Sequence, residues 1–436
     1  MTPAARIAAT IEVLEKTQSS NSPADEVVSA YFRGRRYIGS KDRRDISQRV
    51  YDIQRRGARL GWWTEASDSR ATVIAHLALA EKTSGDGIKQ LFSGEGYAPP
   101  RLTADEAALV GRLAGRDLDD PSMPAAVRLE VPDWLMDDLG EQFGENLEAE
   151  LAALNRPAPL DVRVNLLKGD RAGALELLRD EGINAEPTPI SPIGLRIGGR
   201  VNLHSSTAYR GGFVEPQDEA SQIAALLCDT KADRLTIDYC AGAGGKTLAL
   251  AASMKDGGPL VACDTDQTRL RRIKARARRA GVSNVTVKCI TGGNGGGNGG
   301  GLDRYQGAAE RVLVDAPCSG SGAWRRNPAA KWKLTPERLR QHVRAQSEIL
   351  AAAAPLVAPG GRLIYATCSV LPPENERQIE AFLAAHPEFS PMPVSQLWGT
   401  ALAGTYQGDG PYLRLSPAGQ GTDGFFVAIT ARKGEP

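Results

Sequence analysis

The sequence predicts a multidomain protein in which a helical amino-terminal domain and a small α+β domain precede an α/β domain with a mostly parallel sheet. The chain has 436 residues, of which 42% are hydrophobic, enough for two or three separate cores. No strong strand pattern interrupts the first hundred residues. After Gly211, in contrast, apolar strand candidates alternate with helical segments, which is typical of a parallel sheet covered on both faces.

Residues 1–126 form the predicted helical domain. The capping patterns at residues 22–25 and 103–106 each predict a helix start. The stretch from Tyr31 to Trp63 mixes arginines with aromatic residues. This mixture suits either amphipathic helices that close a small core or contact with an RNA backbone, and core packing is the simpler interpretation of the aromatics.

Residues 127–210 form the predicted middle domain, because "LDVRVNLL" alternates like a strand and "DRAGALELLRDEGI" follows it like a helix that ends at Gly182. Residues 211–436 form the predicted α/β domain. Its strand candidates are residues 235–240, 259–264, 285–290, 311–317, 362–368 and 425–431. The run "GGNGGGNGG", which begins at Gly292, predicts a flexible loop after the third strand.

Composition excludes several classes of protein. There is no apolar run of membrane-spanning length and no secretory signal pattern, so we expect a cytoplasmic protein without membrane contact. Six cysteines without a C-x-x-C pair and four scattered histidines argue against a disulfide framework and against a metal site. The net charge of +1 conceals seven basic residues between Arg269 and Arg279, which indicate either a solvated helix face or a surface for phosphates.

The stretch "DYCAGAGGKT", Asp238 to Thr247, resembles a phosphate-binding loop without matching one. A P-loop needs glycine where Cys240 stands, and a dinucleotide-binding fingerprint needs its third glycine where Thr247 stands. Asp264 follows Gly245 by 19 positions, close to the spacing at which an acidic residue binds a ribose in nucleoside-binding folds. The pattern therefore favours an adenosine ligand without phosphates, such as S-adenosylmethionine, over an ordinary tight turn.

Chemically capable side chains stand at the ends of the strand candidates, where ligands bind in such sheets. Asp238, Asp264, Asp315 and Cys368 each close one strand, and Cys318 follows Asp315 in the turn "DAPCSGSG". Both cysteines lie in polar turns, where a thiol is reachable and a helix start favours the thiolate. A thiolate beside a methyl donor indicates covalent activation of a pyrimidine. The other four cysteines are expected to be small buried hydrophobic residues, namely Cys228, Cys240, Cys263 and Cys289.

The motifs "DYCAGAGGKT", "DAPCSGSG", "YATCSVLPPENE" and "TDGFFVAI" closely resemble the Sun/Fmu family of RNA (cytosine-5) methyltransferases. The resemblance covers residues 211–433. It implies a Rossmann-like methyltransferase domain that uses S-adenosylmethionine, with small-subunit ribosomal RNA as the substrate. The helical part looks like the NusB-like domain of the bacterial ribosomal RNA members, and the middle part like their RRM-like domain. A monomer is expected.

Carried over to this chain, the resemblance makes Cys368 the nucleophile at cytosine carbon 6 and Cys318 the residue that assists release of the methylated RNA. Asp315 would hydrogen-bond the cytosine near N3 and the amino group, and Asp264 would bind the ribose of the cofactor. The cofactor site implied by the resemblance consists of Cys240, Ala241, Gly242, Ala243, Gly244, Gly245, Lys246, Asp264 and Asp315.

Two alternatives to this function remain open. Family members have an aspartate near the adenine after the third strand, where this chain has Thr291 and the glycine run, with Asp303 only beyond it. A catalytically weak or inactive RNA-binding assembly factor is therefore the main alternative. An enzyme acting at an exocyclic nitrogen is the other, although the sequence 315–318 lacks its usual motif. The segment "AWRRNPAAKWK", from Ala323 to Lys333, is predicted to lie where RNA enters, with core packing as the alternative for Trp332.

Overall fold

The computed structural model describes the chain apart from residues 21, 66–67, 200, 291–300, 403–407, 409 and 435–436. The chain divides into two compact units. One combines Met1–Arg156 with Trp324–Thr335, and the other combines Pro157–Ala323 with Pro336–Pro436. Twelve residues that follow the Pro-Cys turn in the sequence are therefore part of the helical unit. The two boundaries between the three predicted domains stay a prediction.

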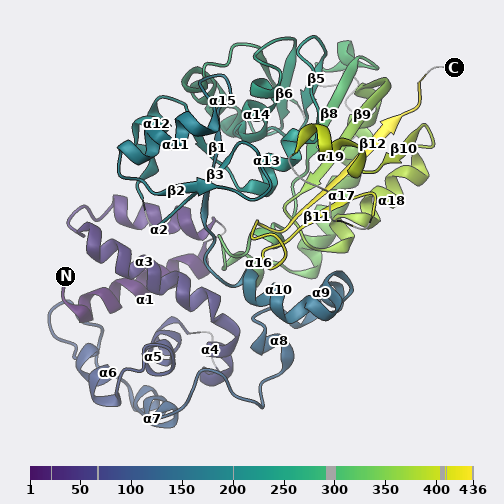
Figure 1. Ribbon diagram of the computed structural model, residues 1–436. Coiled ribbons are helices and arrows are strands. Elements are labelled where there is room, and N and C mark those ends of the chain that lie inside the picture. The colour runs from purple at the N-terminus through teal and green to yellow at the C-terminus, as the bar shows by residue number, and fades with distance from the viewer. Residues whose placement is uncertain are drawn as a thin grey trace. The chain divides into compact units, whose positions relative to one another are not determined.

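The first unit is helical throughout its described residues (Figure 1). Its core lies where α1 packs against α3 and α5, around Val50, Val73 and Leu77. The helices are α1 (Pro3–Ser19), α2 (Ala24–Arg33), α3 (Ser40–Arg55), α4 (Gly57–Thr64), α5 (Ser69–Leu79), α6 (Gly85–Leu91), α7 (Ala104–Leu113), α8 (Ala125–Arg128), α9 (Met136–Phe143), α10 (Leu147–Leu154) and α16 (Ala330–Lys333).

One of the two predicted helix caps in this unit is confirmed. Thr103 and Glu106 form a reciprocal capping box at the start of α7. The helix start predicted at residues 22–25 is also confirmed, because α2 begins at Ala24, but its N-cap is Pro23, which offers no side-chain acceptor. A proline at the cap position leaves the serine one residue too early to bond the first turn.

The second unit contains a small antiparallel sheet with the strand order β2-β3-β1-β4. The strands are β1 (Leu160–Val164), β2 (Ala185–Pro187), β3 (Gly194–Ile197) and β4 (Val214–Pro216), and the helices of this part are α11 (Arg171–Asp180) and α12 (Thr207–Arg210). Val162, Leu178 and Leu195 are buried between the sheet and α11. This arrangement confirms the predicted small α+β part.

The larger sheet of the second unit has the strand order β10-β12-β9-β8-β5-β6-β7, and β11 pairs with β12. Strands β5 to β9 are parallel, whereas β10, β11 and β12 pair antiparallel. The strands are β5 (Thr236–Asp238), β6 (Leu260–Asp264), β7 (Val285–Cys289), β8 (Ala309–Asp315), β9 (Val357–Thr367), β10 (Phe389–Met392), β11 (Leu413–Leu415) and β12 (Phe425–Arg432). All six predicted strands are present.

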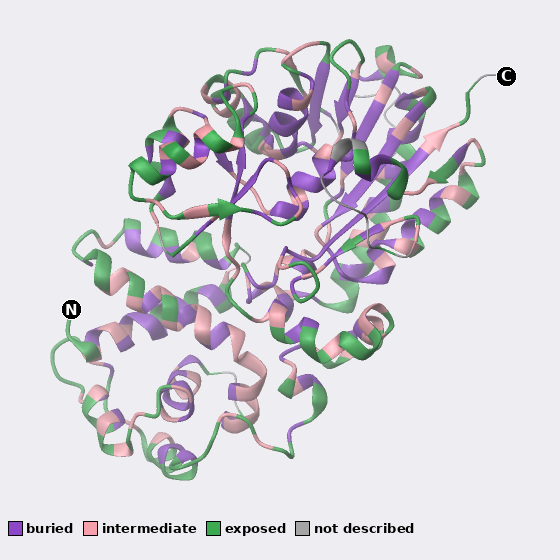
Figure 2. Cartoon of the chain, in the orientation of Figure 1, coloured by how far each residue is buried: buried purple, intermediate pink, exposed green. Residues whose placement is uncertain are grey.

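Helices cover both faces of this sheet, as predicted. Leu313 and Ile364 face α13 and α14, whereas Val312 and Tyr365 face α17 and α18. The helices are α13 (Glu219–Leu226), α14 (Gly245–Ser253), α15 (Gln267–Ala280), α17 (Pro336–Ala353), α18 (Glu376–Ala385) and α19 (Ser395–Ala401). Figure 2 shows the central strands buried along most of their length. The chemistry must therefore lie at the strand ends, where the backbone emerges.

Candidate active site

The loop between β5 and α14 contains the glycines of the predicted cofactor site. Gly242 and Gly244 have φ angles of 54° and 85°, a conformation that residues with a Cβ atom rarely adopt. A Cβ atom at Gly242 would collide with the Arg269 guanidinium, and one at Gly244 would lie 2.9 Å from Ile273 Cγ1. The loop therefore requires glycine at both positions and presents its backbone.

Asp264 ends β6 and lies beside this loop. Its Oδ2 accepts a hydrogen bond from the Gly242 amide at 2.8 Å, and its Oδ1 accepts one from the Asp266 amide at 2.8 Å. The Arg269 guanidinium lies 3.9 Å from Oδ2. The carboxylate thus connects the glycine loop to the start of α15. Its contact with a ribose stays a prediction.

Asp238 lies beneath the loop and is fully buried. Its Oδ2 accepts a 2.6 Å hydrogen bond from the Thr247 hydroxyl, and its Oδ1 has no hydrogen-bond partner among the described residues. Burial raises the pKa of Asp238 to about 7, and the nearby charge of Asp315 adds to the increase. Burial also raises the pKa of the Cys240 thiol well above its usual value, so this thiol stays protonated.

Lys246 and Asp315 form an ion pair at the ends of β5 and β8. The Lys246 Nζ atom lies 2.8 Å from Asp315 Oδ2 and 4.9 Å from the centre of the Phe425 ring. Lys246 is largely buried, whereas Asp315 retains partial exposure. The lysine therefore orients the aspartate.

The two predicted thiols meet above the ends of β8 and β9. The Sγ atoms of Cys318 and Cys368 are 3.5 Å apart. The Gly322 amide donates a 3.0 Å hydrogen bond to the Cys368 carbonyl, which holds the two loops together. Parallel neighbouring strands end at the same edge of a sheet, and this brings together cysteines separated by 50 residues.

The expectation that both thiols favour the thiolate is wrong for Cys318. The hydrogen bond to Cys368 and burial raise the pKa of Cys318 well above its usual value, and the charges of Cys368 and Glu374 add to the increase. Cys318 is therefore a protonated thiol. The sequence around Cys318 did not indicate the raised pKa, because Cys368 and Glu374 lie about 50 residues further along the chain.

The expectation for the remaining cysteines holds at Cys228 and Cys263, which are buried. It is wrong at Cys289, which is exposed, and Cys240 is partly exposed. Cys289 lies on β7, the edge strand of the sheet, and no further strand covers this edge among the described residues. An edge position cannot be recognised from an apolar strand pattern alone.

Two arginines that the sequence analysis missed support the glycine loop. Arg163 on β1 donates to the Gly245 carbonyl at 2.8 Å, and Arg276 on α15 donates to the Ala243 carbonyl at 2.6 Å. Glu215 on β4 pairs with Arg276 and so connects the small sheet to α15. The Arg163 side chain is buried, although it is a cation on a short strand. The position of the small sheet beside the loop is the reason.

The expectation for the segment after the Pro-Cys turn is largely wrong. Trp324, Arg325 and Lys331 are buried. Lys331 donates a 2.9 Å hydrogen bond to Asn155 Oδ1, within the helical unit. Trp332, for which core packing was the alternative, donates through Nε1 to the Gln54 carbonyl at 3.1 Å and is 37% exposed. Most of this segment therefore packs inside the helical unit.

The other basic run forms the exposed face of α15. Arg276 and Arg279 both pair with Glu215. The other five basic residues of the helix are exposed, namely Arg269, Arg271, Arg272, Lys274 and Arg278. This helix therefore offers a positive surface on the unit that contains the thiols.

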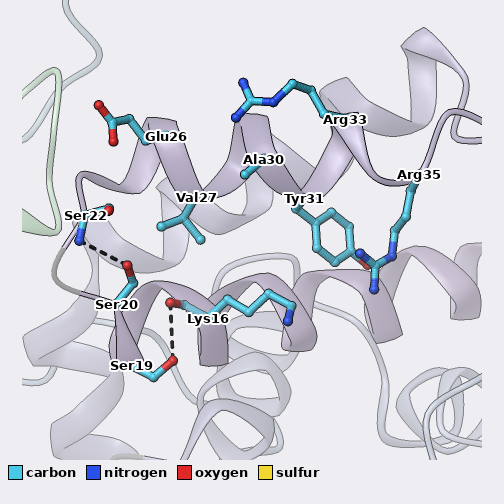
Figure 3. Close-up of a pocket in the computed structure, with 10 residues that line it drawn as sticks. All are labelled: Lys16, Ser19, Ser20, Ser22, Glu26, Val27, Ala30, Tyr31, Arg33 and Arg35. Atoms are coloured by element: carbon cyan, nitrogen blue, oxygen red, sulfur yellow. Dashed lines mark hydrogen bonds between the residues drawn. The ribbon is translucent and has the colours of Figure 1, made fainter. Parts of the chain in front are cut away.

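Two sequence features contribute nothing to the described site. Thr291 and the glycine run lie outside the described residues. Asp303 is exposed and begins a single 3-10 turn beyond the run. A cavity of about 540 Å³ between α1 and α2 is lined by Lys16, Tyr31 and Arg35, and the Arg35 guanidinium stacks on the Tyr31 ring (Figure 3). None of its lining residues belongs to the glycine loop or the thiol pair, so it is not the candidate site.

Comparison with known proteins identifies the family. The sequence model described as "16S rRNA methyltransferase RsmB/F" matches residues 225–430, and the RsmF/B-like ferredoxin-like domain matches residues 131–204. The probable ribosomal RNA small subunit methyltransferase B of Bacillus subtilis is 30% identical over 319 residues, 73% of this chain and 70% of the relative. Its counterpart in Salmonella typhi is 33% identical over 371 residues, 83% and 79% of the two chains. The chain belongs to the RsmB/F family.

Membership in the RsmB/F family confirms the predicted Sun/Fmu resemblance. The chain is a methyltransferase that uses S-adenosylmethionine. The crystal structure of PH0851 superposes with a TM-score of 0.77 at 26% identity and covers 99% of both chains. That of NSun6 from Pyrococcus horikoshii with SFG has a TM-score of 0.60 at 20% identity, covers 70% of this chain and 99% of that one, and bears on the fold alone.

The residues at the glycine loop fit the cofactor of the RsmB/F family. S-adenosylmethionine carries positive charge at its sulfonium and amino groups, and the loop is surrounded by the carboxyl groups of Asp238, Asp264 and Asp315. One oxygen of Asp238 is buried without a partner among the described residues. Among those residues there is no cluster suited to a metal ion and no helix that could cross a membrane.

Proposed function

We propose that this member of the RsmB/F family methylates carbon 5 of a cytosine in small-subunit ribosomal RNA, with Cys368 as the nucleophile. The observation that carries the proposal is the 3.5 Å separation of the Cys318 and Cys368 sulfurs, on loops that follow β8 and β9. Carbon 5 of cytosine becomes nucleophilic only after a thiolate adds at carbon 6. Methylation of an exocyclic nitrogen needs no thiol, so a thiol pair favours carbon 5.

In this mechanism, Cys368 adds to carbon 6 and moves electron density toward N3 and carbon 5. Asp315 hydrogen-bonds the ring near N3 and the amino group, and Lys246, 2.8 Å away, holds that carboxylate in place. S-adenosylmethionine supplies the methyl group that carbon 5 accepts. Solvent then accepts the carbon 5 proton, and the Cys368 sulfur departs as a thiolate, which restores the aromatic ring.

Cys318 assists the last step. Its raised pKa keeps its proton, so it can donate an S–H hydrogen bond to the departing Cys368 sulfur, 3.5 Å away. A donor at this position stabilises the negative charge that develops on the leaving sulfur. The assignment of attack to Cys368 rests on the motif resemblance, because the geometry places both sulfurs at the same strand ends.

The cofactor residues are assigned from the family resemblance. The backbone from Cys240 to Lys246 would border the methionine part of S-adenosylmethionine, and Asp264 would bind the ribose hydroxyls. Glycines at positions 242 and 244 allow the ligand to approach the backbone closely.

The RNA assignment draws on the relatives, which are named ribosomal RNA small subunit methyltransferases. The exposed cations of α15 suit a phosphate backbone. The target cytosine must leave its stack to reach the thiols, so a loop or locally open region of the RNA is the expected substrate. We propose a cytoplasmic monomer, because ribosomal RNA is the substrate and one chain supplies both the glycine loop and the two thiols.

A denaturing gel with labelled RNA and S-adenosylmethionine tests the mechanism. Cys368→Ala should lose both methylation and the covalent adduct. Cys318→Ser should slow elimination and accumulate RNA bound to protein, and the double variant should show no adduct. An adduct from Cys368→Ala with none from Cys318→Ser would reverse the two roles.

Two further measurements test the rest of the proposal. Calorimetric titration of the folded protein with S-adenosylmethionine should show binding, and the absence of binding would favour an inactive assembly factor.

Bisulfite sequencing of ribosomal and transfer RNA, from cells with the wild-type protein or with Cys368→Ala, should identify one cytosine that is protected from conversion in the wild type and loses this protection in the variant. Loss of protection in transfer RNA alone would overturn the ribosomal substrate.

A further inference from the structure

Each of the two cysteines is followed by a serine, and both serines bind one carboxylate. The hydroxyl of Ser369, next to Cys368, donates to Glu374 Oε2 at 2.5 Å. The hydroxyl of Ser319, next to Cys318, donates to the same oxygen, and the Ser319 amide donates to Oε1 at 2.8 Å. Glu374 thus connects the loop that contains Cys318 to the loop that contains Cys368.

Glu374 is held in turn by the surrounding elements. It is fully buried and lies in the turn Pro372–Glu374, just before α18. Gln346 on α17 donates through Nε2 to Glu374 Oε1 and to the Pro317 carbonyl, both at 3.0 Å. The Tyr365 hydroxyl donates to the Glu374 carbonyl at 2.7 Å. A buried carboxylate with this many donors has little freedom to move, because each lost hydrogen bond would leave a buried polar group unpaired.

Hydrogen bonds between the loops complete the network. The Ser321 hydroxyl lies 2.9 Å from that of Ser369 and accepts a 2.9 Å hydrogen bond from the Val370 amide. The Leu371 amide donates to the Ser369 hydroxyl at 3.0 Å. Each serine hydroxyl can donate only one hydrogen, and the carboxylate can only accept while it is ionised. The ionised form of Glu374 therefore fixes the direction of both hydroxyl groups.

We propose that Glu374 is a positioning residue for methyl transfer, whose carboxylate holds Ser319 and Ser369 and thereby keeps the sulfurs of Cys318 and Cys368 in contact. Glu374 does not touch the cytosine in this assignment. The inference rests on the proposed function, because it assigns both thiols to one reaction. The charge of Glu374 also adds to the raised pKa of Cys318 and so helps to keep that thiol protonated.

Glu374→Gln tests the proposal with little change of shape. The glutamine keeps an acceptor for the Ser319 amide and Gln346 but turns a donor toward the two hydroxyl groups. We expect kcat to fall by about a hundredfold, while KM for S-adenosylmethionine stays within about twofold, because a misplacement near 1 Å has an effect of this size. Glu376→Gln is the matched control, since it removes a carboxylate two residues away that pairs with Arg414. Equal kcat for the two variants overturns the proposal.

A second measurement does not depend on methylation. Diamide removes two hydrogens from a pair of adjacent thiols and forms a disulfide, and mass spectrometry after alkylation gives the rate for Cys318 with Cys368. Glu374→Gln should slow this reaction by at least about tenfold relative to the wild type, because the sulfurs lose their fixed contact. An unchanged or faster rate overturns the proposal. If the wild type forms the disulfide but does not methylate RNA, the proposed function fails and the positioning role stands.

Circular dichroism should confirm that each variant is folded. Ser369→Ala is the second variant, because it removes one hydroxyl donor and leaves the carboxylate in place. Its disulfide rate should lie between those of the wild type and Glu374→Gln. A rate equal to the wild type in folded Ser369→Ala also counts against the positioning role.

Discussion

Two basic segments, residues 269–279 and residues 325–333, look equivalent in the sequence and behave oppositely in the structure. In α15 five of the seven cations are exposed, and Leu270, Ile273 and Ala280 are buried at helical spacing. In the second segment, Arg325 and Lys331 are buried in the helical unit. A basic residue therefore indicates a surface for phosphates only where the apolar periodicity of its helix places it on the solvent-exposed face.

The buried segment is held by a charge network. Glu130 is buried, and it accepts hydrogen bonds from the Ala58 amide at 2.9 Å and from Arg59 Nε at 2.8 Å. Burial raises the pKa of Glu130 and lowers that of Lys331 to about 8, while each charge partly offsets the shift of the other. Charges at this depth need partners, whereas the cations of α15 are hydrated.

The largest effect is expected from Lys331→Glu. A second carboxylate beside Glu130 should destabilise the helical unit by about 3–5 kcal/mol, the usual effect of breaking a buried charge pair. Urea unfolding followed by circular dichroism measures the change. Arg272→Glu on α15 is the control and should alter stability by less than about 0.5 kcal/mol. Equal losses would mean that the two segments do not differ.

The pH dependence of the free energy of unfolding should show the titration of Lys331. Its pKa falls from 10.5 to about 8 on folding, so the unfolded chain binds more protons than the folded chain between these values. Stability should therefore rise with pH from about 8 to about 10.5. Lys331→Met should remove this rise, and Lys333→Met should retain it. The measurement is the urea midpoint across this pH range, and a slope unaffected by Lys331→Met would contradict the assignment.

Charge reversal on α15 should change RNA binding and leave folding intact. Arg271→Glu, Lys274→Glu and Arg278→Glu together should reduce the slope of log affinity against log salt by about 2 to 3, because each phosphate contact contributes nearly one. Filter binding at several salt concentrations measures it. Arg325→Glu should instead lower the unfolding midpoint and keep the slope. The opposite pattern would reverse the comparison.

The smallest effect is expected at Trp332. Trp332→Phe removes the hydrogen bond to the Gln54 carbonyl and should cost about 1 kcal/mol of stability. RNA affinity should stay within about twofold, because the indole packs beside Gly57 in the helical unit. A tenfold loss of affinity without a change in stability would restore the stacking role suggested by the sequence.

The sequence by itself determined six of the eight strands of the large sheet, the glycine loop, Asp264 and the two thiols at their strand ends. These features depend on local periodicity and on short spacings, which chain geometry converts directly into position. Tertiary structure alone decided the burial of Lys331, the exposure of Cys289, the contact of Arg163 with the loop and the hydrogen bonds of Glu374. Each of these depends on which distant segment packs against the residue, and the free energy of burying a charge is set by that neighbour rather than by the adjacent sequence.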